Sequence, residues 1–190
     1  MKLGFYEPKE NPKSAGAWHK PGQAAPEVGR IKNNPKKVMA TVFWSARGLL
    51  HIDFLESGGS ITSEYYCSLL DQVQAKLKSQ LSERALKKVI FLQDNCPAHK
   101  ARNTMAKLAE LGWKLLPHPP YSPDLAPSDF YVFCRFKKEV LATRFGDDSE
   151  LRELVTSYFE LKTADWYRTG LLELEDRFQR ILLNGGSYIE

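Results

Sequence analysis

The sequence is poor in cysteine and has no long apolar run. Its three cysteines are too few and too scattered for a disulfide scaffold or a zinc knuckle, so a reducing compartment fits best. No stretch of about 18 apolar residues occurs, which excludes a membrane-spanning helix from this sequence. The opening MKLGFYEPKE has no apolar core of signal-peptide length. We therefore expect a globular protein with no membrane partner.

Size and composition fit one folded domain, since the 190 residues are 43% hydrophobic and 26% charged. The net charge of +4 is unevenly spread. Residues 1–145 carry 22 Lys/Arg against 13 Asp/Glu, whereas residues 146–190 carry five against ten. A basic body is compatible with a polyanionic partner, although a solvated surface of mixed charge is the simpler interpretation.

Apolar patterning predicts strands and helices in alternation. Strands are expected at 3–8, 36–45, 49–56, 87–93 and 113–118, and helices at 62–81, 101–111, 128–141, 149–163 and 171–183. The run at 87–93 is short and continuously apolar, which is typical of a strand buried on both faces. Residues 8–37 are rich in Pro, Gly, Asn and Lys and are expected to form a long loop, either functional or disordered. This order predicts an α/β layered domain. Thr62 or Ser63 can cap the helix at 62–81, and Gly112 stands where a C-terminal cap of the helix at 101–111 belongs.

Two aspartates stand at element ends where chemistry is commonly placed. Asp94 follows an apolar strand and Asp129 begins a helix, with thirty-four residues between them. Carboxylates held in this way bind divalent metal ions for phosphodiester chemistry in ribonuclease-H-like folds. Each also has a structural explanation. Asp94 can cap the turn through Asn95, and Asp129 would lie beside a Ser128 cap in a first helical turn, where acidic residues are favoured. Asp124, in the proline-rich loop, is a rival carboxylate.

Other polar residues near these aspartates are candidates for supporting roles. His99 opens the helix after Asp94 and is a candidate, with Asn95, for contacting a metal-bound group, although such a histidine commonly caps or packs. His118 lies between prolines and is open to either role. Paired lysines are further candidates for phosphate contacts. The alternative is that each pair is a solvated end of a strand or helix. The residues assigned to possible DNA contacts are Lys36, Lys37, His118, Lys137 and Lys138.

Several segments resemble the mariner family of DNA transposases. The most specific are FLQDNCPAH and LPHPPYSPDLAPSDFYVF, and the segments KKVMATVFWSARGLLHIDFL, GGSITSEYYCSLLD and NGGSYIE are similar to the same family. The resemblance extends from about Trp18 to the end. The spacing between Asp94 and Asp129 also matches that of the family's last two catalytic aspartates.

The resemblance implies a ribonuclease-H-like, retroviral-integrase-like α/β fold with a mixed sheet flanked by helices, formed by residues 1–190 as one catalytic domain. It implies that Asp94 and Asp129 are catalytic and bind Mg²⁺ or Mn²⁺ for cleavage of transposon ends and strand transfer into a TA target. Residues 8–37 correspond to a clamp loop that joins two subunits, which implies a homodimer. The implied partner is DNA and the implied location is the nucleus.

The sequence departs from the family at its start. The helix-turn-helix modules that read transposon ends are not in this sequence. The family's first catalytic aspartate belongs to an Asp-Glu-x-Trp segment just ahead of FYEP, where this sequence reads MKLG. We expect neither Glu7 nor Asp53 to replace it, and so expect that this chain alone does not cut DNA. The alternatives are a repurposed DNA-binding or dimerisation module and a generic metal-dependent nuclease.

Overall fold

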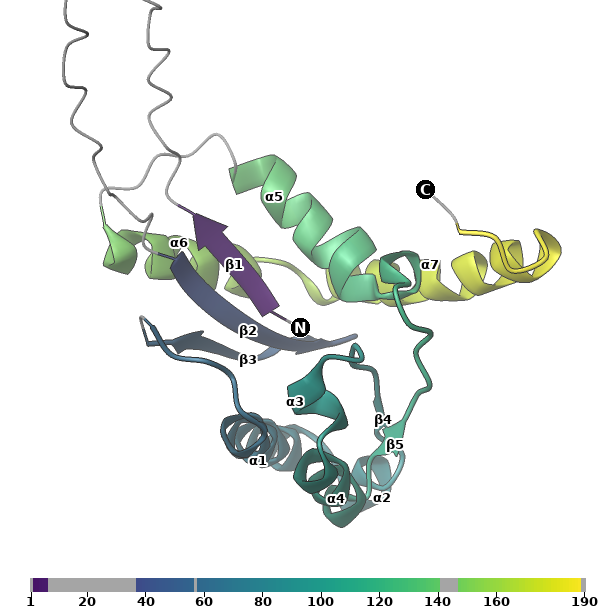
Figure 1. The fold of residues 1–190 in the computed structure, drawn as a ribbon, viewed down its shortest axis with the longest axis horizontal. Helices are drawn as coiled ribbons and strands as arrows, with labels where there is room; N and C mark the ends of the chain where they lie inside the picture. Colours follow the sequence, from purple (N-terminus) through teal and green to yellow (C-terminus); the bar gives the residue numbers. More distant parts are fainter. Residues whose placement is uncertain (1, 7–36, 57, 141–146, 189–190) are drawn as a thin grey trace, which may run out of the picture.

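A three-stranded antiparallel sheet forms the centre of the molecule (Figure 1). The computed structural model describes residues 2–6, 37–56, 58–140 and 147–188. The strand order is β1-β2-β3, and a separate parallel pair is formed by β4 and β5. The strands are β1 (Lys2–Tyr6), β2 (Lys37–Ser45), β3 (Gly48–Leu55), β4 (Ile90–Phe91) and β5 (Lys114–Leu115).

Helices cover both faces of the three-stranded sheet (Figure 1). The α-helices are α1 (Ser63–Gln80), α2 (Glu83–Leu86), α3 (Pro97–Lys100), α4 (Arg102–Leu111), α5 (Cys134–Val140), α6 (Asp148–Glu160) and α7 (Ala164–Leu183). A 3₁₀ turn, η1 (Pro123–Leu125), and a π-helical turn, η2 (Ser128–Phe133), precede α5. None of the described helices is long and apolar enough to cross a membrane.

The hairpin of β2 and β3 creates two hydrophobic cores, because alternate residues of a strand point to opposite faces. Val38 and Val42 pack on one face with η2, α5 and α6. Phe43 packs on the other face with α1, α4 and Trp113. Since β2 is covered on both faces, it occupies the position of a central strand.

Local signals for the helix ends are confirmed at several positions. The Thr62 hydroxyl accepts a hydrogen bond from the Tyr65 amide and so caps α1, which selects Thr62 from the two residues that the sequence allowed. Gly112 ends α4 with φ of 70°, the left-handed conformation that favours glycine. The last helix begins at Ala164, seven residues before its predicted start at 171, because Thr163 caps its first turn.

The structure differs from the prediction at the central sheet. The expected strand at 87–93 is reduced to the two residues of β4, and Ile90 is 64% exposed instead of buried. One continuous mixed sheet was expected, whereas the described residues form two small sheets. The apolar pattern of β4 did identify a strand, but burial on both faces also requires neighbours that a local pattern does not specify.

The predicted loop at 8–37 lies outside the described residues, except that Lys37 begins β2. Lys36 lies outside them as well. The predicted cap at Ser128 is wrong, because the π-helical turn follows Pro127 and has no side-chain cap. The Ser128 hydroxyl instead accepts a hydrogen bond from the indole of Trp44 at 2.9 Å, which ties η2 to β2.

Candidate metal centre

Asp94 lies just beyond β4 with its carboxylate held by two donors. Its Oδ1 accepts from the Cys96 amide at 3.0 Å, and Nδ1 of His99 lies 2.7 Å from the same oxygen. The hydrogen bond from His99 is the main reason why the pKa of Asp94 lies well below its usual range, and the Cys96 amide adds to it. Both contacts use Oδ1, so among the described residues Oδ2 is the oxygen that remains for a cation.

His99 is itself fixed by a small buried network. Its side chain is 1% exposed, and its ring centroid lies 4.1 Å from that of Tyr66. The Tyr66 hydroxyl donates to Gln93 Oε1 at 3.1 Å, and Gln93 Nε2 donates to the His99 carbonyl at 3.1 Å. Since Gln93 precedes Asp94, this network holds the end of β4, α1 and α3 together and fixes the orientation of the carboxylate.

Asp129 reaches the same region from a different element. It lies in the π-helical turn η2, a conformation that occurs frequently at functional sites. Burial raises the pKa of Asp129 to about 6, and the negative charge of Asp94 contributes to the rise. The two aspartates, distant in sequence, therefore lie within electrostatic reach of each other.

The donors of this site suit a hard divalent cation. The oxygens of Asp94 and Asp129 are the ligand type that Mg²⁺ and Mn²⁺ prefer. A cation would also offset the electrostatic repulsion between the two half-buried carboxylates. Asp94, Cys96 and His99 also offer ligand atoms within 4.8 Å of one another. Because His99 directs Nδ1 at Asp94, its role in this geometry is to position the carboxylate.

The other predicted site residues are distributed around this centre. Asn95 Nδ2 donates to the carbonyl of His118 at 2.9 Å, which joins the segment after β4 to the segment after β5. His118 is half-buried, and burial lowers its pKa. Lys137 and Lys138 are exposed on α5, and the charge of Lys137 acts on Asp129. The side chain of Lys37 lies outside the described part of the chain.

The rival carboxylates come from other elements. Asp124 is 4% exposed within η1, and its backbone carbonyl accepts a hydrogen bond from Arg177 at 3.3 Å. Its negative charge acts on His118, as does that of Asp94. Asp53 lies on β3 and accepts a hydrogen bond from the Tyr65 hydroxyl.

Sequence reasoning missed Tyr66, Gln93 and Cys96. Tyr66 was assigned only to the apolar face of a helix, and its contact with His99 spans 33 positions, so no local signal pointed to it. Cys96 was considered only as a disulfide or zinc residue, although its contribution is a backbone amide. The position of Gln93, next to Asp94 at the end of an apolar strand, was the one available signal.

Comparisons with known proteins show similarity to transposases. A family profile described as "Transposase (partial DDE domain)" matches residues 9–87, a range that ends before Asp94. The human protein "Histone-lysine N-methyltransferase SETMAR" is 37% identical over 182 residues, which are 95% of this chain and 27% of that protein. "Mariner Mos1 transposase" of Drosophila mauritiana is 31% identical over 182 residues, with 95% and 53% covered. The chain thus spans about a quarter and about half of these two relatives.

Solved structures match more completely. The Mos1 transposase catalytic domain with raltegravir and Mg has a TM-score of 0.78 at 31% identity, and the match covers 83% of this chain and 80% of that one. A corresponding structure with Mn has a TM-score of 0.77. A Mos1 paired-end complex with the left transposon end has a TM-score of 0.80 at 30% identity, with 100% of this chain and 55% of that one covered. The chain therefore belongs to the mariner transposases as a homologue of the Mos1 catalytic domain, with the ribonuclease-H-like α/β fold of that domain.

Proposed function

We propose that the chain is the catalytic domain of a DNA transposase and that Asp94 and Asp129 bind Mg²⁺ or Mn²⁺. The observation that carries the proposal is that the carboxylate of Asp94, at the end of β4, acts electrostatically on that of Asp129 in η2, while both described contacts of Asp94 use Oδ1. Metals in the related catalytic-domain structures support the choice of cation.

The residues of the chain have separate tasks in this proposal. Bound divalent ions would supply activation of the attacking oxygen and stabilisation of the leaving oxygen in phosphodiester cleavage and strand transfer. Asp94 and Asp129 would hold the ions, and His99 would keep Asp94 ionised and oriented. Asn95 would fix the spacing of the two segments that border the site.

The proposed substrate is DNA, including transposon ends and a TA target. The positive charge of residues 1–145 supports a phosphate-binding role, and Lys137 and Lys138 are exposed on α5, from which the charge of Lys137 acts on Asp129. A related transposase has been crystallised as a paired-end complex with transposon-end DNA. We also propose that residues 8–37 pair two subunits and that the protein acts in the nucleus.

We propose that this chain alone holds the metal weakly and does not cut DNA. Two-metal chemistry generally requires more carboxylates than two, and Asp53 on β3 accepts a hydrogen bond from the Tyr65 hydroxyl.

Metal binding and DNA nicking test these proposals together. We expect calorimetry to show Mn²⁺ binding that is lost in both Asp94→Asn and Asp129→Asn, while Asp165→Asn, which changes an exposed acid on α7, leaves binding unchanged. The same proteins are incubated with supercoiled plasmid and Mg²⁺ or Mn²⁺, and no nicking is expected. Binding that survives either substitution contradicts the site. Nicking that both substitutions abolish contradicts the proposed inactivity and shows that another group completes the site.

A second candidate is a DNA-binding or dimerisation module without catalysis. It is favoured by the similarity to a human protein that is named for a different activity and of which the chain spans 27%. Salt-sensitive, sequence-independent DNA binding, with neither Mn²⁺ binding nor nicking, would favour this function over a transposase site.

A further inference from the structure

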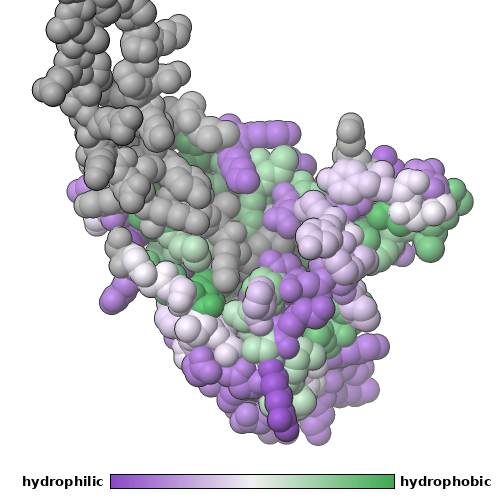
Figure 2. All heavy atoms as spheres, viewed as in Figure 1, coloured by the Kyte–Doolittle hydropathy of each residue, from purple (hydrophilic) through white to green (hydrophobic). Residues whose placement is uncertain are grey.

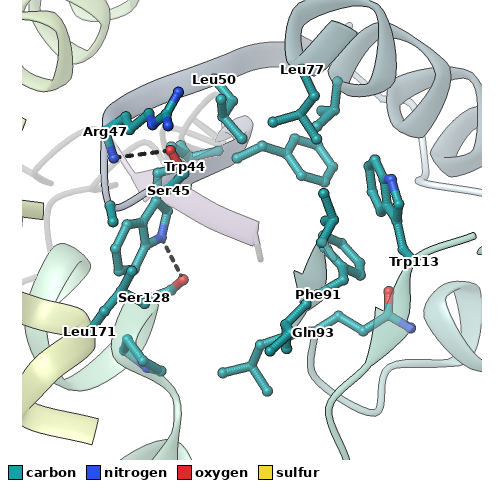
Figure 3. A pocket seen from close by; sticks show the side chains of 18 of the residues that line it. Trp44, Ser45, Arg47, Leu50, Leu77, Phe91, Gln93, Trp113, Ser128 and Leu171 are labelled. Atoms are coloured by element: carbon teal, nitrogen blue, oxygen red, sulfur yellow. Dashed lines mark hydrogen bonds between the residues drawn. The ribbon is translucent and has the colours of Figure 1, made fainter. Parts of the chain in front are cut away.

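Three side chains with different ligand atoms meet in the turn between β4 and α3. The carboxylate of Asp94, the thiol of Cys96 and the imidazole of His99 each offer one ligand atom, and these atoms lie within 4.8 Å of one another. Asp94 and Gln93 also line an apolar cavity of about 360 Å³, in which Figure 3 shows Gln93 beside Phe91. The cluster thus begins where β4 ends, and it shares one residue, Asp94, with the proposed Mg²⁺ or Mn²⁺ centre.

The backbone of this turn holds the three side chains together. Oδ1 of Asp94 accepts a hydrogen bond from the Cys96 amide at 3.0 Å, and the Cys96 carbonyl accepts one from the His99 amide at 3.0 Å. Pro97 follows at the start of α3, where its fixed φ restricts the chain further. Less conformational freedom is therefore lost when a ligand binds to the three side chains, which favours binding.

The imidazole of His99 is held rigidly inside the cluster. It is 1% exposed, and its ring packs against that of Tyr66 at a centroid distance of 4.1 Å. Its Nδ1 lies 2.7 Å from Oδ1 of Asp94, so a shared proton lies between the two atoms. A metal ion that bonds to both groups takes the place of this proton, and the neutral ring then carries its proton on Nε2.

The spacing of the ligand atoms suits a tetrahedral zinc ion. Bonds of about 2.0–2.3 Å from Zn²⁺ to nitrogen, oxygen and sulfur place the ligand atoms roughly 3.3–3.8 Å apart. The contact of 2.7 Å between Asp94 and His99 is shorter than this separation, and the 4.8 Å limit of the whole set is longer. Small rotations of the half-buried Asp94 and Cys96 side chains bring all three atoms to bonding distance. Thiolate and imidazole favour Zn²⁺, whereas Mg²⁺ prefers oxygen ligands alone.

We propose that Asp94, Cys96 and His99 bind Zn²⁺ and that this ion excludes Mg²⁺ or Mn²⁺ from the neighbouring centre. A water molecule completes the tetrahedron, as in other zinc sites with three protein ligands. The Cys96 thiol releases its proton to solvent, and its sulfur donates an electron pair to the ion. Zinc binding itself does not depend on the proposed transposase function, whereas the exclusion of Mg²⁺ or Mn²⁺ rests on it.

The exclusion follows from charge. The carboxylate of Asp94 and the thiolate of Cys96 together balance the two positive charges of Zn²⁺. Of the two aspartates in the proposed centre, Asp129 then remains as the one whose charge attracts a second cation. We therefore expect saturating Zn²⁺ to weaken Mn²⁺ binding by about tenfold or more.

Cobalt spectroscopy tests the zinc site in the unsubstituted chain. Co²⁺ can occupy tetrahedral sites of nitrogen and sulfur ligands and, unlike Zn²⁺, gives a thiolate-to-metal charge-transfer band in the near ultraviolet. We expect this band to appear with Co²⁺ and to disappear when Zn²⁺ is added. Zn²⁺ should also slow the alkylation of Cys96 by iodoacetamide, followed by mass spectrometry, but not that of Cys134 on α5. Absence of the band, or unchanged alkylation of Cys96, overturns the zinc site.

Matched cysteine variants locate the ion. Since loss of an outer-shell partner already weakens metal binding by about 10–100-fold, loss of the thiolate in Cys96→Ser should weaken Zn²⁺ binding by about a hundredfold or more. Cys134→Ser makes the same change in another half-buried side chain and should bind Zn²⁺ as the unsubstituted chain does. Near-UV circular dichroism confirms that both variants are folded. Equal Zn²⁺ affinity in the two variants contradicts the proposal.

Calorimetry with Mn²⁺ separates the two parts of the inference. Zn²⁺ is added at a concentration that saturates the unsubstituted chain but not Cys96→Ser. We expect it to lower the Mn²⁺ affinity of the unsubstituted chain and to leave that of the variant at its own zinc-free value. Mn²⁺ binding that Zn²⁺ does not change in either protein contradicts the exclusion. A cobalt band without any Mn²⁺ binding contradicts the proposed transposase centre, and with it the exclusion, while the zinc site stands.

Discussion

At the scale of single residues, Asp94 and Asp129 differ in how the fold treats their charge. Oδ1 of Asp94 contacts two donors, and these contacts lower the pKa of its carboxyl group. Asp129 is half-buried in η2 beside that negative charge, and its pKa is raised to about 6. The fold therefore stabilises one carboxylate and strains the other, which is the arrangement expected where a cation binds.

Asp129→Asn should stabilise the protein at neutral pH. The pKa of Asp129 is about 6 in the folded state and 3.8 as a reference, so the stability associated with its protonated form is present below about pH 4 and is lost as the pH rises through about 6. Partial exposure screens the penalty, and we expect a gain of about 1 kcal/mol, or roughly 2–4 °C in Tm, at about pH 7.5. Thermal melts should show the gain shrinking at about pH 5. A gain that is equal at both pH values would contradict this account.

His99→Ala should weaken Mn²⁺ binding by about tenfold, because Asp94 loses the donor that keeps it ionised and oriented. The buried ring also packs on Tyr66, so the variant will be less stable, and binding is measured by calorimetry well below its melting temperature. His99→Gln can still donate to the carboxylate and should recover part of the affinity. If Ala and Gln bind Mn²⁺ equally well, His99 acts only through packing.

At the scale of elements, the position of Asp129 depends on a close contact between α7 and η2. Gly170 is buried on α7, and a Cβ added there would lie 2.5 Å from Cδ1 of Tyr131 in the π-helical turn. Real Cβ atoms do not approach ring carbons this closely, so Tyr131 and its turn would have to move. The glycine thus sets the distance between the last helix and the segment that carries Asp129.

Gly170→Ala should destabilise the protein by about 1–3 kcal/mol through overpacking, measured by urea unfolding. Because the displaced turn carries Asp129, we also expect weaker Mn²⁺ binding. Leu172→Ala, two residues further on at a 59% exposed position, is the matched control and should change both quantities little. Unchanged stability in Gly170→Ala would mean that α7 shifts without cost.

The sequence was informative about elements wherever a local rule applied. The hairpin of β2 and β3, the Thr62 cap and the Gly112 end followed from propensity, capping and glycine conformation. It failed at β4, because whether an apolar run is buried depends on strands contributed by distant residues. The π-helical turn at Asp129 was also missed, since an extra residue in a helical turn has no compositional mark.

At the scale of the whole molecule, the candidate site was predictable only in part. The two aspartates followed from their places at element ends and from the resemblance of their segments to a family. The support by His99, Tyr66 and Gln93 was not predictable, since it brings α1, α3 and β4 together through contacts between side chains. The far end of α7 shows a further feature that patterning did not reveal, exposed Leu182 and Leu183 on an extended arm (Figure 2).

Charge is likewise distributed over the whole molecule, and it predicts how DNA binding should respond to substitution. Lys137 and Lys138 are exposed on α5, and the charge of Lys137 reaches Asp129. If both lysines contact phosphates near the metal centre, replacing both by alanine should weaken duplex binding and reduce the slope of log affinity against log salt by about 2.

The control removes the same charge from a different face. Lys76 and Lys78 are exposed on α1, across the three-stranded sheet from α5 (Figure 1). Replacing both by alanine changes the net charge equally, so any effect of overall charge on long-range attraction is matched. We expect this control to keep the salt slope of the unsubstituted chain. Equal loss of slope in the two double variants would mean that DNA is attracted by the basic body as a whole, with no phosphate path beside Asp129.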